Sequence, residues 1–384
     1  METGLGKQAD GVGGGRAVRL PQLDALRGLM MVLMALDHAN HFVAQQHSPG
    51  EYWGGVLPVY GDPLAFVTRF VTHLSAPGFF FLMGAGIVLF AKSRQRLGWG
   101  RGAIAAHFAL RGCVLIALQF FVVNAAWEQS PGGWVPEVYV GVLFALGGAM
   151  ILAGGALLWL GPVYLLGWTV ALLIGTELLT PEPAAWQQSF PLLQRLLLVP
   201  GGDSRLWVNY PVLPWMGLVA FGMAFGHWLA RDAVRTFDRA VQMGVTFIGA
   251  FVAIRLLDGF GNIRPRAGST WIDFLNVVKY PPSIGFTLLT MGVNLTIMGL
   301  MAKVRGPAEA GLRLLAVFGR VPLFFYVAHL YLYAGLGWWL APRGVSIVQM
   351  VPYWLLGLVV LYPVCWGYGW LKRRYPGNLI LRLI

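Results

Sequence analysis

The sequence predicts an all-α integral membrane protein, built as a bundle of about ten transmembrane helices. Of its 384 residues, 57% are hydrophobic and only 11% are charged. Apolar stretches of the roughly 20 residues that a helix needs to cross a bilayer recur from end to end. This composition is typical of a polytopic membrane protein.

The expected helices are ten apolar segments, most of them separated by short polar or Pro/Gly-containing loops. They cover residues 24–44, 64–91, 101–126, 138–160, 162–179, 211–230, 239–257, 282–302, 313–340 and 350–371. Only Gly161-Pro162 separates the fourth from the fifth, which favours a tight hairpin and leaves one long kinked helix as the alternative. Residues 21–375 form the predicted membrane domain, between a disordered cytoplasmic tail (1–20) and a second cytoplasmic tail (376–384).

Lysine and arginine are unevenly divided between the two alternating sets of loops, which predicts the orientation in the membrane. One set holds seventeen, within residues 1–19, 92–101, 231–239, 303–313 and 372–382. The other holds six: Arg195, Arg205, Arg264, Arg266, Lys279 and Arg343. Both termini are therefore expected in the cytoplasm, and the short tails suit a bacterial cytoplasmic (inner) membrane. Most of the net charge of +12 then comes from lysines and arginines in the loops expected on the cytoplasmic side, so no nucleic-acid partner is expected.

The sequence lacks the motifs of several kinds of functional site. The two cysteines, Cys113 and Cys365, lie in apolar segments and predict neither a disulfide framework nor a metal cluster. The chain has no Walker loop, HExxH, CxxC pair or dinucleotide fingerprint, so no metal and no nucleotide hydrolysis is expected. The nucleophile-elbow pattern GxSxG is also absent, which weakens a serine hydrolase interpretation.

The first apolar segment, residues 21–41, carries a polar stripe along an otherwise apolar helix. Arg27 and His38 are eleven residues apart, so they lie within about 20° of one face and about 16 Å apart along the axis. Asp37 stands beside His38 and is expected to pair with His41 at i,i+4. Because imidazole titrates near neutral pH, His38 is a candidate acid, base or nucleophile, with Arg27 and Asp37 nearby.

Two further histidines in apolar segments are open to both a catalytic and a packing interpretation. His73 precedes a Pro-Gly pair in THLSAPGFFFLMGAG, which can bend the helix. His329 has Tyr326 at i−3 and Tyr333 at i+4. These tyrosines can fix the tautomer of His329 or simply be its hydrogen-bond partners.

Five arginines fall within the predicted helices, where a charge is costly unless it is paired, solvated or able to snorkel. They are Arg27, Arg69, Arg111, Arg255 and Arg320. Arg255 lies near an outer helix end and is expected to snorkel to the interface. Arg69 either snorkels as well or pairs with a histidine one turn on, at position 73. Arg111 and Arg320 lie deeper, which favours a buried polar role.

The sixth helix opens with NYPVLPWMG, which places Asn209, Tyr210 and Trp215 at the predicted outer surface. Such an aromatic platform can hold a sugar, although Trp and Tyr are also ordinary anchors at a membrane interface. These three residues are the candidates for acceptor binding.

Five segments in sequence order resemble the heparan-alpha-glucosaminide N-acetyltransferase-like family of membrane acyltransferases. They are LDALRGLMMVLMALDHANHF, THLSAPGFFFLMGAG, YPVLPWMGLVAFG, KYPPS and FGRVPLFFYVAHL. The spacing Arg27-x10-His38 is also similar to the arginine–histidine signature of the acyltransferase-three superfamily, whose bundles are related in architecture. In the lysosomal-type enzymes a histidine of the first lumenal loop is associated with acetyl transfer. Pro63 aligns with that position here, so neither that histidine nor a heparan substrate is carried over.

The resemblance implies acyl transfer across a bilayer, from a cytoplasmic acyl-CoA, commonly acetyl-CoA, to an amino or hydroxyl group of a sugar or glycan outside. His38 would be the catalytic histidine, and Arg27 its partner on the donor path. Arg111, Arg320 and Tyr326 are further candidates for donor binding. A cavity is expected to connect Arg27 with His38.

Two other functions stay open. A transporter or lipid flippase would line a polar route with the same arginines and histidines. A non-catalytic scaffold would have little use for so many intramembrane polar residues. Glycine-rich helix faces would also permit a homodimer.

Overall fold

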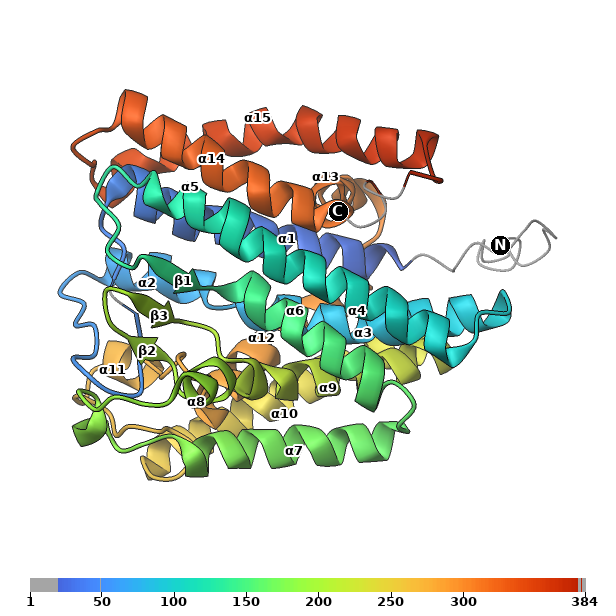
Figure 1. Cartoon of the computed structure of the whole chain (residues 1–384), viewed down its shortest axis with the longest axis horizontal. Helices are drawn as coiled ribbons and strands as arrows, with labels where there is room; N and C mark the ends of the chain where they lie inside the picture. Colours follow the sequence, from blue (N-terminus) through green and yellow to red (C-terminus); the bar gives the residue numbers. More distant parts are fainter. Residues whose placement is uncertain (1–19, 49, 379–380, 382–384) are drawn as a thin grey trace.

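The computed structural model of the chain describes residues 20–48, 50–378 and 381. The two predicted tails, 1–20 and 376–384, fall largely outside these residues. The described chain is a bundle of long helices with very little β structure (Figure 1), which confirms the all-α prediction.

Eight helical spans among the described residues are long and apolar enough to cross a membrane, so the chain is a multi-pass membrane protein. Two spans are composite. Pro63–Arg96 contains α2 (Pro63–Thr72) and α3 (Ser75–Arg96), and Arg101–Glu128 contains α4 (Arg101–Leu118), η2 (Gln119–Val123) and α5 (Asn124–Glu128). The other six are α7 (Pro162–Leu179), α9 (Val212–Arg231), α10 (Ala233–Leu257), α12 (Ile284–Met301), α14 (Pro322–Leu340) and α15 (Ile347–Arg374).

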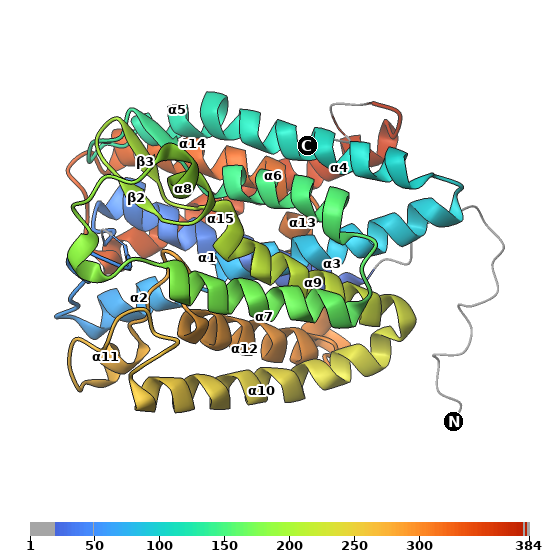
Figure 2. The same cartoon turned by 60° about the horizontal axis from the view of Figure 1, so that its bottom comes forward.

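Two further helices would complete the predicted ten. α1 (Pro21–Ala39), which ends in the π-helical turn η1 (Asn40–Ala44), is too polar for the apolar set because it holds Asp24, Arg27 and Asp37. α6 (Val142–Leu152) continues into η3 (Ala153–Leu157), and together they are shorter than the other spans. The total of ten and the orientation in the membrane stay predictions. The chain reverses direction between α6 and α7 (Figure 2), as the predicted hairpin requires, but the hairpin is not a tightly packed pair, since both helices pack against α9.

Two predicted helices are each broken near a proline. The helix expected at 64–91 stops after Thr72 and restarts at Ser75, because the ring of Pro77 conflicts with the helical carbonyl group of His73. The helix expected at 313–340 is divided into α13 (Glu309–Gly319) and α14. Pro322 opens α14 and disfavours helical backbone at the residue before it.

Most of the non-helical connections gather at one end of the bundle, here called the loop end (left in Figure 1). It holds β1 (Val138–Val140), β2 (Gly201–Gly202), β3 (Leu206–Val208), η4 (Pro183–Ala185), α8 (Leu192–Leu197) and α11 (Trp271–Leu275). β3 pairs in parallel with β1 (Val138 opposite Leu206) and antiparallel with β2 (Gly201 opposite Val208). The prediction of helix at 138–141 is therefore wrong.

The opposite end of the bundle, here called the tail end, carries the start of α1 and the end of α15 (Figure 1). The short helix η5 (Gly306–Ala308) links α12 to α13. Between the two ends α1 lies inside the bundle and packs against α3, α12, α13, α14 and α15. Leu26, Met30 and Ala35 of α1 are buried in the core. The central position of α1 brings its polar stripe into the protein interior.

Glycines allow α3 and α9 to approach each other closely. A Cβ atom at Gly84 would collide with the carbonyl oxygen of Val219, and one at Gly222 with the carbonyl oxygen of Phe81. Gly86, also in α3, faces open space. Close contact through small residues is typical of helix pairs in membranes.

Gly84→Ala is expected to destabilise the protein by about 1–3 kcal/mol, because the backbone of α9 has to move to admit the methyl group. Gly86→Ala is the matched control on the same helix, and its effect should stay within about 0.5 kcal/mol. Thermal unfolding of both variants in detergent measures the difference. Equal unfolding midpoints would contradict the close packing of α3 on α9.

Candidate active site

A cavity of about 90 Å³ lies where the loop end meets the helices. Residues from α1, α3, α5, α14 and the loops before α9 and α12 line it. Five residues singled out from the sequence are among them: Asp37, His38, Asn209, Tyr210 and Tyr326. The fold thus brings together candidates from three distant parts of the chain.

His38 of α1 and His329 of α14 form a buried pair beside this cavity. His38 Nδ1 lies 2.6 Å from His329 Nε2, and His329 Nδ1 lies 2.9 Å from the carbonyl oxygen of Phe325. A carbonyl oxygen only accepts, so His329 Nδ1 carries a hydrogen and donates it. His329 Nε2 is then the acceptor for the hydrogen on His38 Nδ1. In this arrangement Nε2 of His38 carries a lone pair instead of a hydrogen. This lone pair accepts no hydrogen bond from the described residues.

Asp37, the neighbour of His38, is held by three side chains at the edge of the cavity. Its Oδ1 accepts hydrogen bonds from Arg69 Nη1 and from the Thr72 hydroxyl, both at 2.8 Å, and its Oδ2 lies 3.2 Å from His47 Nε2. The predicted pair with His41 does not form, so that prediction is wrong. His41 instead packs edge-on against Trp127, with ring centroids 4.6 Å apart.

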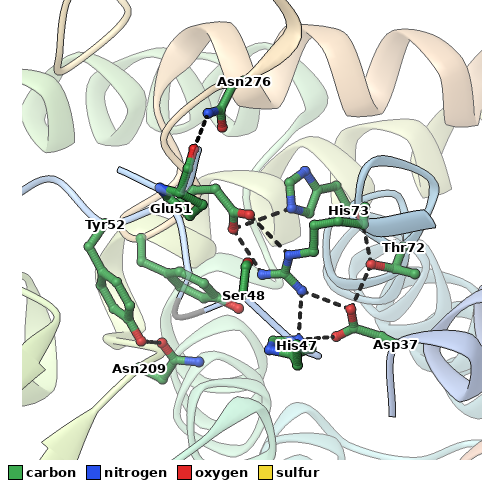
Figure 3. A network of polar contacts seen from close by, with 12 residues as sticks. Asp37, His47, Ser48, Glu51, Tyr52, Thr72, His73, Asn209 and Asn276 are labelled. Carbon is green, nitrogen blue, oxygen red and sulfur yellow. Dashed lines mark hydrogen bonds and ion pairs between the residues drawn. The ribbon is translucent and has the colours of Figure 1, made fainter. Parts of the chain in front are cut away.

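Arg69 links Asp37 to a second carboxylate, that of the fully buried Glu51, and Figure 3 shows these two carboxylates on opposite sides of its unlabelled guanidinium group. Its Nε and Nη2 donate to the two oxygens of Glu51 at 3.0 and 2.8 Å. His73 lies on the far side of Glu51, with Nε2 3.3 Å from Oε2. Arg69 and His73 therefore share a carboxylate and do not pair with each other, and Arg69, 3% exposed, does not snorkel. His73 is buried too and is not among the lining residues of the cavity.

Glu51 lies in the loop between η1 and α2, outside the membrane-spanning helices. Burial by itself would raise the pKa of the Glu51 carboxyl group, but the charge of Arg69 and the adjacent His73 hold this pKa well below its usual range. Glu51 is therefore an anion at neutral pH, and its ion pair with Arg69 fixes this loop against α2.

Of the three predicted acceptor residues, Asn209 belongs to a chain of hydrogen bonds at the cavity wall. Trp207 Nε1 donates to the Tyr52 hydroxyl, which donates to Asn209 Oδ1, and Asn209 Nδ2 donates to the Tyr139 hydroxyl oxygen. Tyr210 also lines the cavity. Trp215 does not, because it is fully buried beneath Tyr210 with ring centroids 4.9 Å apart. Its place in the structure is a support for Tyr210.

The predicted donor arginines lie together at the tail end, apart from the cavity. Arg27 Nη1 donates to Asp24 Oδ1 at 3.2 Å and to the carbonyl oxygen of Gly319 at 3.0 Å. Arg320 Nε lies 3.7 Å from Asp24 Oδ2, and Arg111 is near enough to Arg27 for their charges to repel. The cavity lined by His38 reaches Met34 and does not include Arg27. The cavity at His38 therefore does not supply the predicted connection to Arg27.

Arg255 is the fifth predicted intramembrane arginine, and its expected snorkelling is wrong. It is 2% exposed and donates to the carbonyl oxygens of Asp273, Phe274 and Asn276 at 2.7–2.8 Å. Arg255 thereby fixes the loop that carries Lys279 and Tyr280 to the cavity.

Several residues of the site were not singled out from the sequence: His47, Glu51, Tyr52, Tyr139, Lys279 and Tyr280. All of them lie in loops or in β1, and they meet only through the tertiary fold. Lys279 and Tyr280 open the KYPPS segment, and Glu51 is a single carboxylate in a loop between two apolar segments. A buried network is not visible in either pattern.

Glu51→Gln is expected to destabilise the protein at pH 7 by about 3 kcal/mol, because Arg69 loses a buried anionic partner. The pKa of Glu51 is depressed in the folded protein, so this stabilisation is present above the ordinary value of about 4.3 and is lost as the pH falls toward the folded value. The difference between wild type and variant should shrink below about pH 4.

Unfolding midpoints in detergent across this pH range check the prediction. The control is Glu309→Gln, whose exposed partner Arg313 lies 3.5 Å away and should contribute little. A destabilisation by Glu51→Gln that does not change with pH would contradict the assigned charge.

Comparison with known proteins identifies the family of the chain. No curated protein matches it significantly. The family model described as heparan-alpha-glucosaminide N-acetyltransferase, catalytic, matches residues 19–254, more than half of the 384. The matched part holds α1, the Arg69 network and the whole of α9, whereas His329 and Lys279 lie beyond it. The chain therefore belongs to the heparan-alpha-glucosaminide N-acetyltransferase family of membrane acetyltransferases.

Proposed function

We propose that the protein transfers an acetyl or other short acyl group from acyl-CoA, bound at the tail end, to an amino or hydroxyl group of a sugar or glycan that enters from the loop end. The distribution of lysine and arginine supports a cytoplasmic tail end, and we place the protein in a bacterial inner membrane. The observation that carries the proposal is the pair of His38 and His329, which leaves the Nε2 lone pair of His38 free at the cavity.

In direct transfer His38 acts as a general base. Its Nε2 takes the proton from the acceptor as the acceptor nitrogen or oxygen bonds to the thioester carbonyl carbon. The carbon–sulfur bond then breaks, and CoA leaves as a thiolate that takes up a proton. His38 becomes a cation in this step, and its Nδ1–H bond to His329 Nε2 stabilises that charge.

The same lone pair supports a covalent alternative. His38 Nε2 would attack the thioester carbonyl carbon and expel the CoA thiolate, which leaves a cationic acyl-imidazolium because Nδ1 keeps its hydrogen. The acceptor would then displace the imidazole and release its own proton. His329 holds the same tautomer in both routes, so the geometry is compatible with either.

The donor would bind between the tail end and His38. Arg27, Arg111 and Arg320 supply positive charge for the phosphates of CoA, and Tyr326, which lines the cavity, would contact the acyl end. The pantetheine arm has to cover the helix rise of about 16 Å from Arg27 to His38. Its path would open beside Met34, where the cavity ends.

The acceptor would lie against the loop-end wall of the cavity, where Asn209 and Tyr210 are its proposed contacts. Membership of an acetyltransferase family favours transfer over the transporter alternative. A scaffold is disfavoured because it offers no reason for a buried histidine pair with an unused lone pair.

His38→Ala is expected to lower acyl transfer by about 10²–10⁴-fold, the usual contribution of a positioned acid–base group. Purified protein with radiolabelled acetyl-CoA and a set of amino sugars measures the product. His107→Ala is the control, since His107 is a histidine of α4 that packs on Phe90 away from the cavity. Full activity of His38→Ala would overturn the assignment, and uptake of sugar into sealed liposomes without covalent product would favour a transporter.

Arg27→Ala is expected to raise the KM for acetyl-CoA by about tenfold or more, with a smaller change in kcat, because a phosphate loses a charged partner. Arg27→Lys should recover part of this loss. Arg313→Ala, an exposed tail-end arginine paired with Glu309, is the control. An unchanged KM for the donor in Arg27→Ala would remove Arg27 from the donor path.

A further inference from the structure

Lys279 is a buried cation at the cavity without a carboxylate partner. Its residue is 4% exposed, it lines the same cavity as His38, and its ammonium lies 5.0 Å from the centre of the Tyr280 ring. Among the residues that the structure describes, the Lys279 side chain has no hydrogen bond and no ion pair. A charged group on so buried a side chain, with no hydrogen bond and no ion pair, costs free energy unless another group compensates its charge.

The backbone holds Lys279 firmly in this position. The amide groups of Lys279 and Tyr280 both donate to the carbonyl oxygen of Glu51, at 2.9 and 3.0 Å. The amide of Trp53 donates to the carbonyl oxygen of Tyr280 at 2.9 Å. The segment that carries Lys279 is therefore tied to the same loop that Arg69 anchors.

The nearby carboxylates are already occupied. Both oxygens of Glu51 accept from Arg69, and Asp37 accepts from Arg69 and Thr72. Each carboxylate thus has short charged contacts of its own. Lys279 contributes only a longer-range attraction to Asp37.

The wall around Lys279 also offers hydrogen-bond donors without acceptors. The Tyr139 hydroxyl oxygen accepts from Asn209 Nδ2, and no described residue accepts the hydrogen of this hydroxyl. The hydroxyls of Tyr210 and Tyr280 lie 3.2 Å apart. One of their two hydrogens joins them, and the other is left to donate elsewhere. An ammonium and two hydroxyl donors at one cavity are the groups that bind an anion.

We propose that the acceptor carries an anionic group, a carboxylate or a phosphate monoester, which binds Lys279 with the hydroxyls of Tyr139 and of the Tyr210–Tyr280 pair. This assignment deepens the proposed acyl transfer. It rests on that proposal, because the anionic ligand is an acceptor only if the protein transfers an acyl group to it. It makes Lys279 a specificity-determining residue, since the bound anion would hold the sugar with its amino or hydroxyl group toward His38. No sequence pattern assigns this role, because in the sequence Lys279 is only one of the six basic residues in the loops expected outside.

The test compares three probes on the wild-type protein: glucosamine, glucosamine 6-phosphate and glucosaminuronic acid. Binding is measured by calorimetry without acetyl-CoA, so no transfer is needed. At least one acidic probe is expected to bind tenfold or more tightly than glucosamine, and the tighter of the two distinguishes phosphate from carboxylate. Equal binding of all three probes would overturn the proposal.

Variants of Lys279 test whether this residue causes the tighter binding of acidic sugars. Lys279→Gln should lower the ratio of acidic to neutral binding at least tenfold, and Lys279→Arg should retain part of it. Lys303→Gln, which removes a lysine after α12 at the tail end, is the control for net charge and should keep the ratio. A preserved ratio in Lys279→Gln would overturn the proposal, and if that variant does not fold, the wild-type comparison still decides.

Transfer assays with the same probes separate this proposal from the acyl-transfer proposal. A preference in binding without any acetylated product would leave the anion site standing and overturn acyl transfer to these sugars. Acetylation of glucosamine and both acids at equal kcat/KM, with equal binding, would leave acyl transfer standing and overturn the anion site.

Discussion

The interaction on which the site depends is the contact of the buried Arg69 side chain with two carboxylates. Arg69 joins Asp37 of α1 to Glu51 of the following loop, with contacts of 2.8 Å on each side. The same Glu51 residue holds Lys279 and Tyr280 through its backbone carbonyl oxygen. One guanidinium thus connects the helix that carries His38 with the Glu51 loop and, through that loop, with the segment that brings Lys279 and Tyr280 to the cavity. Breaking such a buried contact is costly because it leaves an unpaired charge.

Two breaks in the helices set the positions of the polar residues around this contact. Pro77 ends α2 at Thr72, which lets Thr72 and Arg69 both reach Asp37 from the last turn of a short helix. Pro322 starts α14 afresh after Arg320, and α14 then presents His329 to His38. A continuous helix in either place would have a different axis over the residues that form the site.

The sequence predicted several residues of the site correctly, but it did not predict the residues that they contact. The helical period placed His38 on a distinctive face of α1, and it does reach the cavity, because that period is a local property. Asp37 was expected to pair with His41 on the same helix, yet its partners come from α2 and a loop. Glu51 and Lys279 were unremarkable loop charges. Such contacts depend on how distant segments meet, which no local pattern contains.

The polar groups of the site differ in whether the protein satisfies them. Arg69 pairs with Asp37 and Glu51, and Asn209 is bonded on both its oxygen and its nitrogen. Among the polar groups left over at the cavity are the ammonium of Lys279 and the lone pair on His38 Nε2. Since buried polar groups are normally satisfied, these two are the positions at which a substrate would complete the network. A cation and a base are complementary to an acceptor that brings an anion and a transferable proton.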